Sequence, residues 1–192
     1  MIGALRPQYP IETERLLLRP FDDGDLDALF EIQSIPEVAA FLYWEPRTRA
    51  EVLQQLERLK AMTRIDEASD SLRLAAVRKD TGALVGDYSL RLHSREHRQG
   101  EVGYITHPAH QGYGFATEGC LPLLRLGFEE LGLHRIFASC DARNIASVRV
   151  MERLGMRREA LFRENEFVKG VWTDELIYAM LASEWRAAGG AR

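Results

Sequence analysis

The chain has 192 residues, which is long enough for one sizeable hydrophobic core and short for two, so we expect one domain over residues 1–192 with its core within about residues 11–186. Hydrophobic residues make up 46% of the sequence and charged residues 28%, a globular composition that excludes disordered, collagen-like and low-complexity classes. The formal net charge of −4 offers no basic surface to a nucleic acid or an anionic membrane, so we expect neither as a partner.

The sequence shows no membrane-spanning, targeting or metal-binding pattern. No apolar run approaches the roughly 18 to 20 residues that span a bilayer, and the first residues lack the charged-then-apolar order of a signal peptide. We therefore expect a cytoplasmic protein. Cys120 and Cys140 lie among apolar residues without C-x-x-C spacing, which favours small core residues over a disulfide, and we expect no metal.

The first half of the chain predicts one strand, two helices and a three-stranded meander. Residues 13–21 form a short β-rich run closed by Pro20, and residues 22–34 begin with the aspartates that a helix start favours. Residues 48–62 repeat apolar side chains at the three-to-four spacing of an amphipathic helix. Three strand-like runs follow, the first two joined by a hairpin turn, at residues 71–79, 83–93 and 100–107.

The second half predicts helix, strand, helix and two final strands. Helical spacing runs over residues 117–131 and ends at Gly132, and a buried strand follows. Asn144 is the expected N-cap of the next helix, which Gly155 ends. The three strand-like runs of this half are residues 133–142, 156–168 and 171–182. The order predicts a mixed α/β (α+β) fold in which helices pack against one sheet.

The segment HPAHQGYGFATEG, residues 107–119, joins a predicted strand to a predicted helix through two glycines. Free main-chain N–H groups and the positive end of a helix dipole meet at such a turn, which is the arrangement of a phosphate site. The alternative is a plain tight turn in which glycine supplies only a positive φ. A Walker loop needs Gly-Lys-Ser/Thr, and a dinucleotide fingerprint needs a glycine where Thr117 stands, so neither of those motifs is present.

The pattern Gln111-x-x-Gly114-x-Ala116 resembles the Gln/Arg-x-x-Gly-x-Gly/Ala motif of the GCN5-related N-acetyltransferases (GNAT). The segments ETERLLLRPF, GEVGYITHPAHQGYGFATEG, DARNIASVRVMERLGM and GVWTDELIYAMLASEW look like the RimJ/RimL ribosomal-protein N-acetyltransferase branch, in the right order along nearly the whole chain. The resemblance implies a single-domain GNAT fold. Its largely antiparallel sheet would have about seven strands, splayed between the fourth and fifth, with about four flanking helices.

The resemblance also implies acetyl-CoA as co-substrate and names its contacts. Main-chain groups of Tyr104, Ile105 and Thr106 would pair with the pantetheine arm, and Asn144 and Ser147 would contact the cofactor. The pyrophosphate would be held by main-chain N–H groups of one continuous segment, which consists of Gln111, Gly112, Tyr113, Gly114, Phe115, Ala116 and Thr117.

Three residues are candidates for proton transfer. An amine acceptor arrives mostly protonated at neutral pH, so a carboxylate must remove a proton, and Glu101 is the family's usual position; the alternative is a surface acid at a strand end. Many members protonate the sulfur with a tyrosine, but Met151 stands at that position. Ser147 is the replacement that this branch offers, unless it serves only as a capping hydroxyl. Tyr178 is another possible donor, unless it is a packed sheet residue.

The resemblance leaves the acceptor open. It implies a primary amine, either a protein N-terminal α-amine or a small molecule such as a polyamine, an antibiotic or an amino acid. Tyr43, Trp44 and Trp172 are candidate walls of the acceptor cleft, although the cluster around Tyr43 also suits a core flap. Family members with this plan are often dimers, which suggests a homodimer. The alternative from another class is a coenzyme-A-binding module that does not catalyse transfer.

Overall fold

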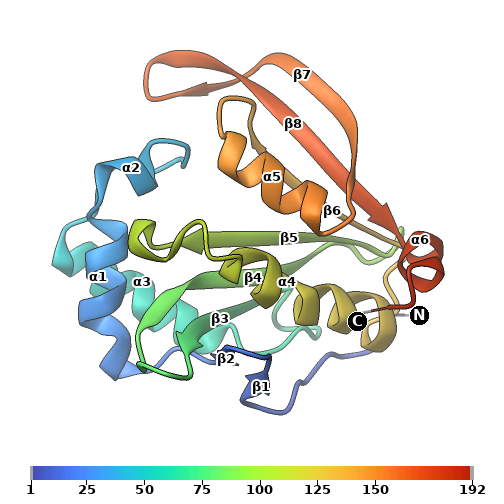
Figure 1. The fold of residues 1–192 in the computed structure, drawn as a ribbon, viewed down its shortest axis with the longest axis horizontal. Helices are drawn as coiled ribbons and strands as arrows, with labels where there is room; N and C mark the ends of the chain where they lie inside the picture. The colour runs from blue at the N-terminus through green and yellow to red at the C-terminus, as the bar shows by residue number, and fades with distance from the viewer. Residues whose placement is uncertain (1, 191–192) are drawn as a thin grey trace.

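The computed structural model describes residues 2–190, which form one mixed α/β domain around an eight-stranded sheet (Figure 1). The strands are β1 (Ile11–Glu12), β2 (Leu16–Arg19), β3 (Ser71–Arg78), β4 (Leu84–Ser94), β5 (Gln99–Thr106), β6 (Arg135–Asp141), β7 (Arg157–Val168) and β8 (Val171–Leu181). The helices are α1 (Leu26–Gln33), α2 (Pro36–Ala39), α3 (Arg49–Ala61), α4 (Phe115–Arg125), α5 (Ile145–Arg153) and α6 (Ala182–Ala187). A π-helical turn, Leu126–Glu130, continues α4.

The strand order is β1-β2-β3-β4-β5-β6-β8-β7, and every neighbouring pair is antiparallel except β5 and β6. The sequence prediction of a largely antiparallel sheet is confirmed. The additional strand, β1, pairs with β2 and was not predicted. Its two residues are too few to show the alternation of side chains that identifies a strand. The helices α2 and α6 were likewise not predicted, because four and six residues are too few to show a helical period.

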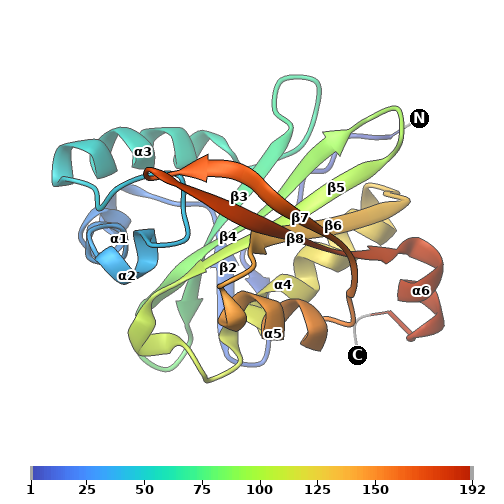
Figure 2. The ribbon, with the colours of Figure 1, turned by 90° about the horizontal axis from the view of Figure 1, so that it is seen from above.

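Helices cover both faces of the sheet (Figure 2). On one face, α1 and α3 bury a cluster that includes Leu29, Leu56 and Ala75. On the other face, α4, α5 and α6 close a larger core that includes Tyr88 and Met151. Burying a large apolar side chain contributes roughly 1.5–3 kcal/mol, so the two cores hold the sheet between the helical layers.

The sheet opens between β5 and β6. These strands pair only from Gln99 to Glu101 of β5, opposite Arg135 to Phe137 of β6, whereas β4 pairs with β5 up to Thr106. Beyond Glu101 the two parallel strands diverge, and this gap is called the opening below. It lies between the fourth and fifth of the predicted strands, where the resemblance places it.

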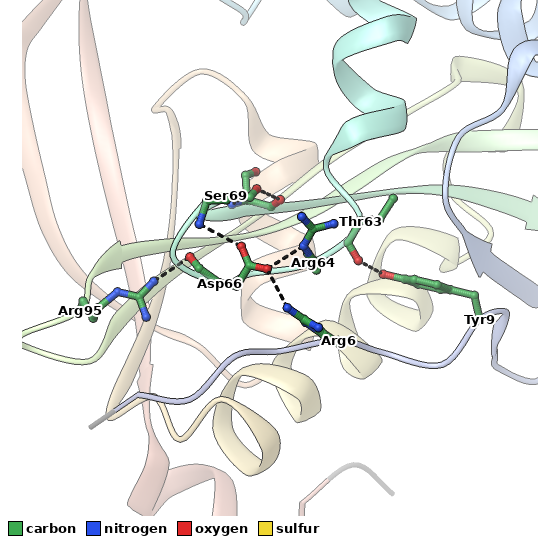
Figure 3. Close-up of polar contacts among 9 residues, drawn as sticks. Arg6, Tyr9, Thr63, Arg64, Asp66, Ser69 and Arg95 are labelled. Carbon is green, nitrogen blue, oxygen red and sulfur yellow. Dashed lines mark hydrogen bonds and ion pairs between the residues drawn. The ribbon is translucent and has the colours of Figure 1, made fainter.

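The N-terminal segment is held against the loop that follows α3 (Figure 3). Leu5 is buried and forms a bridge with Ile65, and the Tyr9 hydroxyl donates to the Thr63 carbonyl over 2.8 Å. The Asp66 carboxylate accepts from Arg64 over 2.6 Å and lies 3.4 Å from the Arg6 guanidinium. These contacts fix the entry into β1 on the side of the sheet away from the opening.

Within residues 2–190, no helix has the length and apolar character needed to cross a membrane. In the same range, no three His, Cys, Asp or Glu side chains gather in a way that would hold a metal ion.

Candidate active site

The turn between β5 and α4 presents a row of main-chain N–H groups. Gly112 and Gly114 have φ of +82° and +83°, which only glycine adopts freely, and Gly114 is the N-cap of α4 without any side-chain cap bond. The first helical N–H with an acceptor is that of Glu118, which donates to Gly114. Among the described residues, the N–H groups of residues 112–117 have no hydrogen-bond acceptor. We call these six groups the amide site; together with the positive end of the α4 dipole they favour the binding of an anion.

A network from the start of β2 fixes the amide site. The Arg15 guanidinium donates to the Tyr113 carbonyl over 3.0 Å and to the Glu118 carboxylate over 2.7 Å, and its plane lies over the Phe115 ring at 4.6 Å. Thr13 and the Arg15 N–H also donate to Glu118. Burial opposes ionisation of Glu118, but these hydrogen bonds and the Arg15 charge outweigh it and hold its pKa below the usual value.

A cleft of about 570 Å³ extends from the amide site along α5, a size typical of small-molecule sites. Its walls come from the α2 region, the end of β5, the amide site and one face of α5, and its lining residues include Tyr104, His110, Thr117, Ser147, Arg149 and Arg153. Thr117 Oγ1 and His110 Nδ1 are buried without a hydrogen-bond partner among residues 2–190. Buried polar atoms rarely lack a partner, so these two atoms and the amide site fit the phosphate groups of a coenzyme A molecule.

The edge of β5 that faces the opening has free main-chain groups. The His107 N–H donates to Val85 on β4 over 2.8 Å, so the alternate residues Tyr104 and Thr106 direct their main-chain groups away from β4 and into the opening. The Gln111 side-chain amide donates a hydrogen bond to the Thr106 carbonyl over 3.1 Å. An extended ligand can therefore pair with Tyr104 as an added strand would.

The Tyr104 side chain links β5 to the first turn of α5. Its hydroxyl lies 2.8 Å from Ser147 Oγ and donates to the Ser147 carbonyl over 3.0 Å, which ties the first turn of α5 to β5. Asn144 caps this turn by accepting from the Ser147 N–H over 3.0 Å. The burial of Tyr104 raises the pKa of its hydroxyl, which therefore remains protonated at neutral pH. Burial also raises the pKa of the nearby Cys140 thiol to about 11, so this thiol is not a thiolate nucleophile.

Glu101 lies on the opposite face of the sheet from Tyr104. Glu101 pairs with Phe137, and residues paired across a ladder share a face while successive residues alternate. By the same register Glu175 of β8 shares the Glu101 face. The cleft beside α5 and the Glu101 face are thus separated by the sheet and meet where β5 and β6 diverge.

Carboxylates gather on this second face. Burial and the charges of Glu166 and Glu101 raise the pKa of Glu175, although Ser139 and Asn165 donate hydrogen bonds to it, the latter over 2.7 Å. The Tyr43 hydroxyl donates to Glu166 over 2.7 Å. The like charges of Glu166 and Glu101 oppose ionisation of Glu175, and although Arg91 lies 3.9 Å from the Glu101 carboxylate, a bound cation would favour the ionised form.

The matches to known proteins agree with this geometry. A family model described as the acetyltransferase (GNAT) domain matches residues 15–157. The chain belongs to the GNAT family of acetyltransferases.

Relatives and solved structures extend the match over the chain. An uncharacterized N-acetyltransferase, YnaD, of Bacillus subtilis (strain 168) is 33% identical over 175 residues, or 91% of this chain and 98% of that protein. A GNAT-family acetyltransferase structure from Bacillus anthracis gives a TM-score of 0.80 at 30% identity, covering 91% of this chain and 99% of that one. A spermidine N-acetyltransferase structure from Vibrio cholerae, in complex with CoA and spermine, shares the fold with a TM-score of 0.75 at 24% identity. The match covers 89% of this chain and 98% of that one.

These matches confirm the predicted activity class. This GNAT chain is an acetyl-CoA-dependent N-acetyltransferase, and its fold is the one predicted from the resemblance. The acceptor amine is not decided by the family, because GNAT enzymes of one fold act on different amines.

Within the GNAT fold, the predicted donors occupy different surroundings. Tyr178 shares the α5 face but its hydroxyl lies 3.3 Å from Glu152, and Tyr178 does not line the cleft. Met151 is fully buried in the core. Ser147 lines the cleft and lies next to Tyr104.

The predicted aromatic residues lie outside the cleft beside α5. Tyr43 and Trp172 are 73% and 61% exposed, and the Trp44 ring stacks under the Arg47 guanidinium at 4.5 Å. The tip of the β7–β8 hairpin contacts residues 39–47, the segment that carries Tyr43 and Trp44, since Lys169 donates to the Ala39 carbonyl over 2.8 Å. This segment and the hairpin therefore border the Glu101 face together.

Sequence reasoning did not single out His110, Arg149 or Arg153, all of which line the cleft. His110 stands next to the recognised motif, so a polar residue just before the glycines was the available signal. Nothing in the sequence distinguished Arg149 and Arg153 from the other surface arginines of the chain.

Proposed function

We propose that this GNAT enzyme, in the RimJ/RimL-like branch, acetylates a primary amine that carries additional positive charge, with Glu101 as the general base. The observation that carries the proposal is the position of Glu101 at the opening, on the face where Glu166 and Glu175 also lie. A cationic acceptor gains from these carboxylates, and its binding lowers the cost of ionising Glu175.

The proposed reaction is direct transfer between the two faces of the sheet. Bound acetyl-CoA supplies a thioester carbonyl at the opening. Glu101, directly or through one water, accepts the proton of the acceptor ammonium and so frees the nitrogen lone pair. The nitrogen–carbon bond then forms as the carbon–sulfur bond breaks, and the main-chain N–H of Tyr104 stabilises the developing oxyanion.

The departing sulfur needs a proton or a hydrogen bond. Ser147 is the proposed donor because it lines the cleft and its hydroxyl lies 2.8 Å from the Tyr104 hydroxyl, while Asn144 holds its main-chain N–H. Tyr178 is the weaker proposal, because its hydroxyl is engaged with Glu152.

A protein N-terminal α-amine is the second candidate acceptor, favoured by the segments that resemble the RimJ/RimL enzymes. Its lower intrinsic pKa, near 8, demands less of the base than an aliphatic amine does. Screening acetyl-CoA turnover against polyamines, ribosomal-protein N-terminal peptides, aminoglycosides and amino acids separates the two. We expect polycationic amines to give the highest kcat/KM; preference for neutral amines or peptides would contradict the cationic acceptor.

Glu101→Gln tests the base. We expect kcat to fall by roughly 10²-fold and the pH–rate profile to change, while the affinity for CoA is retained, because Glu101 lies on the face opposite the cleft. The measurement is release of free thiol across the pH range. An unchanged rate and pH profile would remove Glu101 from the mechanism.

A further inference from the structure

The face of α5 that lines the cleft carries two arginines. Ala146, Arg149, Val150 and Arg153 follow the three-to-four spacing of a helix, so they share one face, while Met151 points into the core. Arg149 and Arg153 are one turn apart and exposed. Neither forms an ion pair or a side-chain hydrogen bond with any residue between 2 and 190, unlike Arg143, which pairs with Asp141 just before the same helix.

The amide site and the arginines differ in the anion that each suits. The amide site offers neutral, fixed donors and a helix dipole, which fit a diphosphate that approaches the main chain closely. The start of α5 offers no equivalent, because Asn144 already accepts from the Ser147 N–H. Arginine side chains instead present paired donors and full charge to a phosphate monoester, which carries close to two negative charges at neutral pH.

Among the arginines of residues 2–190, only Arg149 and Arg153 line the cleft. The only carboxylate that lines the cleft, among the described residues, is Glu37 from the α2 region. The cleft wall therefore carries positive charge on α5, separate from the amide site on the β5–α4 turn.

Building on the proposed use of acetyl-CoA, we propose that Arg149 and Arg153 bind the ribose 3′-phosphate of the coenzyme and so make the enzyme discriminate against 3′-dephospho-CoA. The diphosphate then lies at the amide site, and the monoester, on the adjoining ribose, lies at the arginines. These residues select the cofactor and take no part in proton transfer.

Calorimetry with CoA and 3′-dephospho-CoA tests the proposal. The wild-type protein should bind CoA about tenfold more tightly, as expected for charge-assisted hydrogen bonds to a partly exposed phosphate. The Arg149→Ala/Arg153→Ala double variant should lose this preference while its Kd for 3′-dephospho-CoA stays within about twofold of wild type. The preference should also shrink as salt is raised, because the arginines are exposed.

Arg186→Ala is the matched control, since it removes one exposed charge from α6, outside the cleft. It should leave both affinities unchanged, and thermal unfolding should show that the double variant is folded. Equal losses of affinity for both ligands in the double variant, or no preference in wild type, would overturn the assignment while leaving the proposed function intact. Failure of the wild-type protein to bind either ligand would overturn both.

Discussion

Thr117 is the third residue of α4, and its side-chain oxygen is buried without a partner among the described residues. Leaving a buried hydroxyl unsatisfied costs roughly 1–3 kcal/mol, so the position is explained if a bound phosphate oxygen accepts from it. The same reasoning applies to His110 Nδ1, whose ring also lines the cleft. Burial lowers the pKa of His110, with contributions from His107 and Arg78, so the ring is neutral at pH 7 and acts through hydrogen bonding.

Replacing Thr117 with Val removes the hydroxyl and keeps the shape of the side chain. We expect affinity for CoA to fall about tenfold, because one hydrogen bond to a charged group is lost. The unfolding temperature should stay the same or rise, because no internal partner is lost. Calorimetry and thermal unfolding measure the two effects, and undiminished affinity for CoA would show that the hydroxyl does not contact the ligand.

At this scale the sequence predicts backbone features better than side-chain partners. The two glycines of the β5–α4 turn were identifiable because positive φ leaves a compositional signal. Gly114→Val would block the amide site but would also strain the turn, because Gly114 has a φ of +83°, so Thr117→Val is the cleaner variant. Arg149 and Arg153 could not be singled out, because their role depends on which face of α5 meets the cleft.

At the scale of elements, the start of β2 and the first turn of α4 act as one unit. Arg15 and Glu118 are 103 residues apart in sequence, yet their side chains bond directly and hold the Tyr113 carbonyl. The strand and the helix were each predicted, but their contact was not, because sequence periodicity reports which face of an element is buried and not which element it meets.

Glu118→Gln should make stability less dependent on pH. The folded-state pKa of Glu118 is depressed, so its ionised form stabilises the fold above the unfolded-state pKa, near 4.3, and this stability is lost as the pH falls through the folded value. At pH 7 the variant should lose about 1 kcal/mol in urea unfolding, and the difference should vanish toward pH 3. Glu130→Gln, at an exposed carboxylate, is the control; equal pH dependence in all three proteins would contradict the role of Glu118.

At the scale of the whole molecule, the opening between β5 and β6 brings together two surfaces that the sheet otherwise separates. One surface carries the cleft, the amide site and α5, and the other carries Glu101 and its neighbouring carboxylates. The order of the long strands and helices was predictable because each long element has a clear period, and the family was predictable from the resemblance carried by the Gln111-x-x-Gly114-x-Ala116 motif and the segments around it. The acceptor was not predictable, because the Glu101 face is bordered by segments that are far apart in sequence. The Tyr43 segment meets the β7–β8 hairpin through contacts such as that of Tyr43 with Glu166, 123 residues away.

We expect the main-chain amides of residues 112–117 to bind the diphosphate of coenzyme A. The most direct measurement is an amide NMR titration of ¹⁵N-labelled protein with CoA, with pantetheine as the ligand that lacks the diphosphate. We predict that CoA shifts the amide resonances of residues 112–117 and that pantetheine leaves them in place. Binding of CoA without a shift at these amides would show that the diphosphate lies elsewhere.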